Sequence, residues 1–191
     1  MGGNGQEMLA PAIRKHLNMQ MITTRIVTPR LLLRDWVEED ALSVLAIFGN
    51  EEVVRWTGAV PIPDVAHARQ WVGMSNHYQA QHGVQEWAVV ERASGEVVGA
   101  CGLGYFDGQL ELGLAYHFAP KVWGMGYATE AVTACLLYAW QAGYPAVVAL
   151  TDGHNEASQH VLERCGFTRT GMVRIEDGGE AVRYVATPVE A

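Results

Sequence analysis

One stretch of this 191-residue chain restricts the possible folds more than any other, because an alternating segment, a glycine-rich turn and an apolar helix follow one another. Apolar residues take every second position of the alternating segment: Leu110, Leu112, Leu114, Tyr116 and Phe118. A period of two predicts a β-strand over 110–118. The turn runs from Trp123 to Ala128, and the helix after it, through Gln141, is almost wholly apolar, which predicts burial against a sheet.

The rest of the chain contains further strand and helix signals. Apolar runs bounded by turn residues predict strands over 26–36, 87–90, 97–101, 147–150, 167–175 and 181–187. Helical spacing and capping residues predict helices over 41–48, 64–81 and 155–164, and a short helical turn over 51–56. This order predicts an α+β (mixed α/β) fold with a mostly antiparallel central sheet of about seven strands flanked by helices.

Charge and composition exclude several classes of function. The 13 Lys and Arg against 21 Asp and Glu give a net charge of −8, which leaves no basic surface for nucleic acid. The longest apolar run, 131–140, is interrupted by Thr133 and falls short of the ~20 residues that cross a bilayer, so no membrane partner is expected. Three widely spaced cysteines and seven scattered histidines predict neither a disulfide framework nor a metal site.

The N-terminal part is set apart by composition. Residues 1–22 are Gly-rich and then weakly helical, without the apolar core of a signal peptide, and are interpreted as a flexible extension. Residues 23–191 contain no linker or repeat and are predicted to form a single domain. A soluble, cytoplasmic protein is expected.

The glycine-rich turn favours an anion site, because glycines let backbone N–H groups converge at a helix start whose dipole is positive. A dinucleotide-binding fingerprint needs a third Gly where Thr129 stands and an acidic residue near Tyr144, and both are missing. A P-loop needs Gly-Lys-Ser/Thr, which is absent. A tight turn without a ligand remains the alternative reading.

Three motifs in order resemble the GNAT (GCN5-related) N-acyltransferase superfamily. The spacing Lys121-x-x-Gly124-x-Gly126 is similar to its pyrophosphate-binding motif, and Asn155-x-x-Ser158, leading to Gly166-Phe167, is similar to the second half of its cofactor site. The opening Thr28-Pro29-Arg30-Leu31-Leu32-Leu33-Arg34 resembles the RimJ/RimL-like branch, which includes ribosomal-protein-alanine acetyltransferases. The resemblance covers roughly 23–187 and implies an acetyl-CoA-dependent N-acetyltransferase.

The resemblance also implies where acetyl-CoA lies. Its pantetheine arm is expected between two splayed strands, pairing with the backbone of 116–118, and its pyrophosphate on amides between Trp123 and Ala128. The cofactor-binding residues implied are Tyr116, His117, Phe118, Lys121, Trp123, Gly124, Met125, Gly126, Tyr127, Ala128, Thr129, Asn155 and Ser158. Lys121 as a solvated surface cation and Asn155 as a plain helix cap remain open alternatives.

The catalytic groups are less clear from the sequence. Where many members of the superfamily have a Tyr that protonates the departing thiolate, this chain has Leu162, so Ser158 is expected to take that role. Glu111 is the candidate base, although the family Glu often stands two residues later, at Gly113, and a water relay is an equal alternative. By alternation, His117 is expected on the same face as Glu111, with Trp56, Trp71, Trp87 and Tyr105 as possible walls of the acceptor pocket.

Two functions remain open. The first is direct attack of a primary amine, on a protein N-terminus or a small molecule, in a ternary complex. The alternative is a catalytically weak acyl-CoA-binding sensor or scaffold. A homodimer is plausible by family resemblance.

Overall fold

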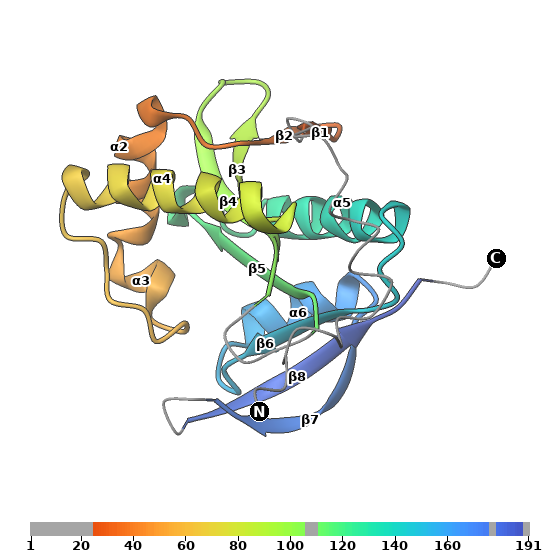
Figure 1. The fold of residues 1–191 in the computed structure, drawn as a ribbon. Helices are drawn as coiled ribbons and strands as arrows, with labels where there is room; N and C mark the ends of the chain where they lie inside the picture. The colour runs from red at the N-terminus through yellow and green to blue at the C-terminus, as the bar shows by residue number, and fades with distance from the viewer. Residues whose placement is uncertain (1–24, 106–110, 176–178, 189–191) are drawn as a thin grey trace, which may run out of the picture.

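A computed structural model describes residues 25–105, 111–175 and 179–188. The predicted extension 1–22, the turn Asp107-Gly108 and Leu110 lie outside the described residues. The described strands form one eight-stranded sheet in the order β1-β2-β3-β4-β5-β6-β8-β7, in which every neighbouring pair is antiparallel except β5 and β6 (Figure 1). The strands are β1 (Arg25–Val27), β2 (Leu31–Arg34), β3 (Glu86–Glu91), β4 (Val97–Gly104), β5 (Gly113–Phe118), β6 (Val147–Thr151), β7 (Thr168–Arg174) and β8 (Glu180–Ala186).

Helices cover both faces of this sheet, and each face has its own apolar cluster. The helices are η1 (Glu38–Asp40), α2 (Ala41–Phe48), α3 (Glu51–Val54), α4 (Val65–His82), η2 (Pro120–Val122), α5 (Tyr127–Gln141) and α6 (Glu156–Arg164). Residues of α5 and α6 share a buried cluster with one face, whereas α2, α3 and α4 share theirs with the other. The α+β fold predicted from the sequence is confirmed.

The predicted strand 26–36 is wrong in one respect, because it is a hairpin of two strands rather than one strand. Pro29 has no N–H for a ladder, and Thr28 closes the turn. The Thr28 N–H donates to the Leu31 carbonyl at 2.9 Å, and the Leu31 N–H donates to Thr28 Oγ1 at 2.9 Å. This extra strand makes the described sheet eight-stranded where about seven strands were predicted.

The splayed strand pair expected from the resemblance is present. Strand β5 pairs with β4 over six positions, from Gly113 to Phe118, but with β6 only at Gly113, opposite Val148. The strand also starts later than the alternation predicted, since β4 ends at Gly104, opposite Gly113, and offers no partner for 111–112. Beyond Gly113 the two neighbours diverge, and we call β5 and β6 the splayed pair.

Helix ends follow the signals in the sequence. Asp64 caps α4 by accepting from the His67 N–H, and Asn155 caps α6 by accepting from the Ser158 N–H. Gly166 follows α6 with a φ of +86°, in the left-handed region that favours glycine. These contacts confirm the predicted starts of α4 and α6.

Buried thiols and absent features complete the description. Cys101 and Cys135 are free and buried, with their Sγ atoms 3.6 Å apart, while Cys165 is half-buried. Among the described residues, no helix has the length and apolarity to span a membrane. In the same residues, no three or more His, Cys, Asp or Glu side chains gather as metal ligands would.

Candidate functional site

The edge of β5 that faces β6 carries peptide groups without a strand partner. The Ala119 N–H donates toward β4, to Val98, while the Leu112 carbonyl accepts from Val148 on β6. Because successive peptide groups alternate between the two edges of a strand, the N–H groups of Tyr116 and Phe118 point to the β6 side. An extended ligand lying along the splayed pair can therefore form strand-like hydrogen bonds there.

The Tyr116 side chain reaches α6. Its hydroxyl lies 2.7 Å from Ser158 Oγ and donates to the Ser158 carbonyl at 3.2 Å. Burial raises the pKa of Tyr116 well above its ordinary value, although its hydrogen bond with Ser158 acts in the opposite direction. Asn155, the cap of α6, accepts from the Ser158 N–H, and Ser158 lies beside β5. From the sequence, Tyr116 was expected to act only through its backbone, and no local signal indicates this side-chain contact.

The glycine-rich turn leads directly into α5. Gly124 and Gly126 have φ of +75° and +78°, and Gly126 is the residue before the helix. The first intrahelical bond is from Glu130 N–H to the Gly126 carbonyl, at 3.1 Å. Four N–H groups, those of residues 126–129, therefore precede the ladder at the positive end of the helix dipole. This arrangement suits a pyrophosphate.

The requirement for glycine in this turn is conformational. A Cβ added at Gly124 would meet nothing within 4 Å, and one at Gly126 would come no closer than 3.5 Å to the Arg30 guanidinium. Space is thus available at both positions. What an L-residue would find strained is the left-handed backbone.

The other predicted cofactor residues surround this turn in different ways. Lys121 forms an ion pair with Glu96, and both side chains are exposed. Trp123 and Met125 are half exposed, while the Trp123 indole N–H donates to the Phe118 carbonyl at 2.7 Å. The structure therefore brings the turn to the end of β5.

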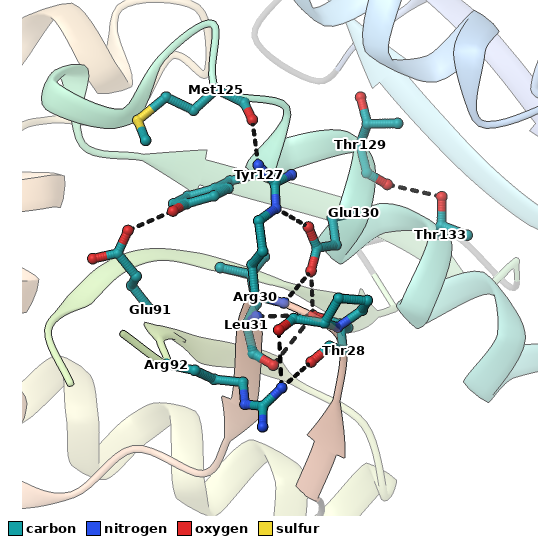
Figure 2. Close-up of polar contacts among 11 residues, drawn as sticks. Thr28, Arg30, Leu31, Glu91, Arg92, Met125, Tyr127, Thr129, Glu130 and Thr133 are labelled. Carbon is teal, nitrogen blue, oxygen red and sulfur yellow. Dashed lines mark hydrogen bonds and ion pairs between the residues drawn. The ribbon is translucent and has the colours of Figure 1, made fainter. Parts of the chain in front are cut away.

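Tyr127 and Thr129 lie inside the first turn of α5. Tyr127 is buried in the core and its hydroxyl donates to Glu91. The Thr129 carbonyl accepts from the Thr133 hydroxyl at 2.8 Å (Figure 2). Both residues place their backbone N–H groups at the start of the helix, as the resemblance requires, while Ala128 between them is half-buried.

Glu111 and His117 are not brought together. Glu111 precedes β5, is about half exposed and accepts from Arg183 Nη2 at 2.8 and 2.9 Å. His117 lies on the face of α2 and α4, where its ring is 4.9 Å from that of Phe48 and its Nδ1 is 3.3 Å from Glu86 Oε2. Arg183 alternates along β8 with Val182 and Tyr184, which pack in the cluster of α5 and α6, so its pair with Glu111 lies on the other face of the sheet. His117 lies on that face too, so the expected shared face agrees with these contacts, although the two side chains have different partners.

The aromatic residues expected at an acceptor pocket differ in exposure. Trp87 is fully buried and packs on Tyr138 with ring centroids 5.2 Å apart, so its assignment as a pocket wall is wrong. Trp71 is half-buried and packs on Phe48 beside His117, at a centroid distance of 4.7 Å. Leu162 is buried in the core and provides no polar group.

The family model described as an acetyltransferase (GNAT) domain matches residues 30–168 of this chain. The chain belongs to the GNAT acetyltransferase family. The relative named uncharacterized N-acetyltransferase YoaA, from Bacillus subtilis (strain 168), is 30% identical to this GNAT chain over 152 residues, covering 77% of this chain and 84% of the relative. The predicted acyltransferase class is confirmed at the level of the family.

Solved structures of low sequence identity share the fold of this GNAT domain. One is a GNAT-family acetyltransferase from Bacillus anthracis, with a TM-score of 0.75 and 21% identity, covering 86% of this chain and 98% of that chain. Another is RimL, a ribosomal L7/L12 alpha-N-protein acetyltransferase in complex with coenzyme A, with a TM-score of 0.74 and 16% identity, covering 86% and 98%. These likenesses show the GNAT fold that this domain shares with both structures.

Proposed function

We propose that this protein transfers the acetyl group of acetyl-CoA to a primary amine by direct attack in a ternary complex. The observation that carries the proposal is that the unpaired edge of β5, the start of α5 and the Ser158 hydroxyl lie around one splayed pair. Acetyl-CoA supplies an activated thioester, and the RimL structure holds coenzyme A on the same fold. The amine is a protein N-terminus or a small molecule.

The chain's own groups fit the demands of acyl transfer. The N–H of Phe118 points from β5 toward β6, where it can stabilise negative charge on a thioester oxygen. The N–H groups of residues 126–129 suit the pyrophosphate, and Lys121, which forms an ion pair with Glu96, is proposed as an added cation. Asn155 orients the first turn of α6, on which Ser158 stands.

Ser158 is the proposed donor to the departing thiolate. The Tyr116 hydroxyl donates its single proton to the Ser158 carbonyl, so its oxygen, 2.7 Å from Ser158 Oγ, can accept from the Ser158 hydroxyl and hold it in place. Ser158 then donates its proton to the thiolate sulfur, and the proton that the amine loses restores the serine hydroxyl through solvent, so that the net transfer runs from nitrogen to sulfur. Ser158 in this way stands in for the tyrosine acid replaced by Leu162.

Glu111 is the proposed proton acceptor for the amine, and the structure adds a condition. Both of its oxygens accept from Arg183, so Glu111 can take a proton only as that contact loosens. A water relay to another carboxylate is the alternative. The Glu111→Gln variant distinguishes the two alternatives. It lowers the rate of acetyl transfer if Glu111 is the base, and leaves that rate unchanged if a water relay carries the proton to another carboxylate.

The decisive experiment measures thiol release from acetyl-CoA in the presence of a panel of peptides, amino acids, polyamines and aminoglycosides. The proposal expects turnover with at least one amine. Tight binding of coenzyme A without turnover on any acceptor would instead favour the acyl-CoA sensor, an alternative that the loss of the tyrosine acid at Leu162 keeps open. Cytoplasmic location and a homodimer remain predictions.

A serine substitution tests the proton donor. Ser158→Ala is expected to lower kcat by roughly 100-fold, the lower end of the usual range for loss of general acid catalysis, while KM for acetyl-CoA changes little. Ser43→Ala removes a hydroxyl of α2, on the opposite face of the sheet from α6, and serves as the matched control. An unchanged kcat in the Ser158 variant would remove this residue from the donor role.

A further inference from the structure

Arg30, in the turn between β1 and β2, contacts the glycine-rich turn from a position 95 residues earlier in the chain (Figure 2). Its Nη1 donates to the Met125 carbonyl at 2.8 Å, and its Nε donates to Glu130 Oε2 at 2.6 Å. Its guanidinium also lies over the Tyr127 ring, 4.6 Å from the centroid. The Arg30 side chain therefore contacts the backbone just before Gly126 and the side chains of Tyr127 and Glu130 after it.

The contact with the Met125 carbonyl fixes the direction of the next N–H. In a trans peptide the carbonyl of Met125 and the N–H of Gly126 point in opposite directions. As the carbonyl is held toward Arg30, the Gly126 N–H points away from it. Two glycines flank Met125, and the Met125 side chain is about half exposed, so side-chain packing contributes little to holding this peptide.

Glu130 ties Arg30 to the first turn of α5. Its carboxylate accepts from the Thr28 hydroxyl at 2.6 Å, from the Arg30 N–H at 2.8 Å and from Arg30 Nε at 2.6 Å. A carboxylate at this position would repel an anion bound at the start of the helix. The Arg30 guanidinium balances that charge and leaves the backbone N–H groups free to attract the anion.

We propose that Arg30 is a positioning residue for the nucleotide end of acetyl-CoA: it orients the Gly126 peptide and neutralises Glu130, so that the start of α5 presents its N–H groups to the pyrophosphate. The identity of the ligand rests on the proposed function. The positioning role of Arg30, which we call the Arg30 brace, rests on the contacts of the β1–β2 turn. Arg30 also lines, with Gly126 and Thr129, a groove of about 800 Å³ along α5.

The test compares two thioesters, acetyl-CoA and S-acetyl-pantetheine, which lacks the phosphates. Arg30→Met is expected to raise KM for acetyl-CoA about tenfold or more, because charge-assisted hydrogen bonds are lost, and to leave kcat/KM for S-acetyl-pantetheine within about twofold. Arg30→Lys keeps the positive charge but lacks the planar guanidinium. It is expected to lose most of the preference for acetyl-CoA over S-acetyl-pantetheine as well. Arg69→Met removes an exposed cation of α4 and is the control.

Equal losses with both thioesters, or an unchanged KM for acetyl-CoA, would overturn the proposal. A second measurement needs no substrate: amide hydrogen exchange over 124–128 in the ligand-free chain is expected to speed up in Arg30→Met and not in Arg69→Met. Absence of turnover in the unsubstituted chain would contradict the proposed function, whereas unchanged exchange would contradict the brace. If Arg30→Met fails to fold, Glu130→Gln, which removes the charged partner of Arg30, is expected to show the same faster exchange to a smaller degree.

Discussion

At the scale of single residues, the site depends on contacts between side chains that are far apart in the sequence. Tyr116 meets Ser158 across 42 positions, and Arg30 meets Glu130 across 100. Both pairs join a strand or turn of the sheet to the first turn of a helix. Removal of one partner therefore affects a helix terminus and the strand or turn it faces at the same time.

Glu130 gives the stability of the protein a specific dependence on pH. Its partial burial opposes ionisation, but the hydrogen bonds from Thr28 and Arg30 outweigh this and hold the pKa of Glu130 below its ordinary value of 4.5. A carboxyl with a lowered pKa in the folded state stabilises above its unfolded pKa and loses that contribution as the pH falls through the folded value.

We expect the free energy of unfolding of the unsubstituted chain to fall below about pH 4.5 more steeply than that of Glu130→Gln. The Gln variant is expected to be less stable at pH 7 by about 1–3 kcal/mol, because a charged acceptor is lost. Urea unfolding at several pH values measures both effects, and Glu52→Gln on the exposed face of α3 is the control. Parallel pH profiles for Glu130→Gln and the unsubstituted chain would contradict this role.

At the scale of elements, the sequence predicted helix starts and strand faces better than strand ends. Asp64 and Asn155 act through the N–H groups of the next three residues, so their roles are local and readable. The end of β5 depends on β4, which stops at Gly104, and that limit is invisible in the alternation itself. The divergence of β5 and β6 entered through family resemblance, since no local signal separates splayed strands from paired ones.

The same distinction applies to the candidate site. The glycine turn and Ser158 were found because their spacing is a local motif, whereas the Tyr116 hydroxyl contact and the Arg30 brace depend on the folded arrangement. Alternation predicted the face of Glu111, whereas its partner Arg183 on β8 depends on the folded arrangement and has no local signal.

The left-handed glycine before α5 has a matched control elsewhere in the chain. Gly126 and Gly95 have φ of +78° and +76°, and neither has an atom closer than 3.5 Å to an added Cβ. Alanine at either position is expected to destabilise the fold by about 1–2 kcal/mol through backbone strain. Gly126→Ala alone is expected to weaken coenzyme A binding by about tenfold or more, measured by calorimetry, since it disturbs the N–H groups of α5. Equal affinity of the Gly126→Ala and Gly95→Ala variants for coenzyme A would show that the turn at Gly126 is not part of the anion site.

At the scale of the whole molecule, a net charge of −8 coexists with the proposed site for a highly anionic ligand. The attraction is local, since it comes from N–H groups at the start of α5, and the nearby Glu130 is neutralised by Arg30. The global charge led to the expectation that nucleic acid is not a partner, and it has no bearing on this site.

Coenzyme A is expected to stabilise the whole domain, because it bridges the splayed pair and α5. At 100 times its Kd, binding contributes about 2.7 kcal/mol, which corresponds to a rise in Tm of roughly 5–10 °C for a chain of this size. Exchange protection is expected on β5 and at residues 126–129 together. Protection at the helix start alone would mean that the pantetheine arm does not lie along β5.

The single pairing between β5 and β6 leaves an open hydrogen-bonding edge in the middle of an otherwise continuous sheet. An unpaired edge can pair with another extended segment, such as one from a second copy of this protein. In a cell, the supply of ligand would then determine what fraction of this protein stays unaggregated. In preparations, samples that are concentrated and free of ligand would be the first to aggregate.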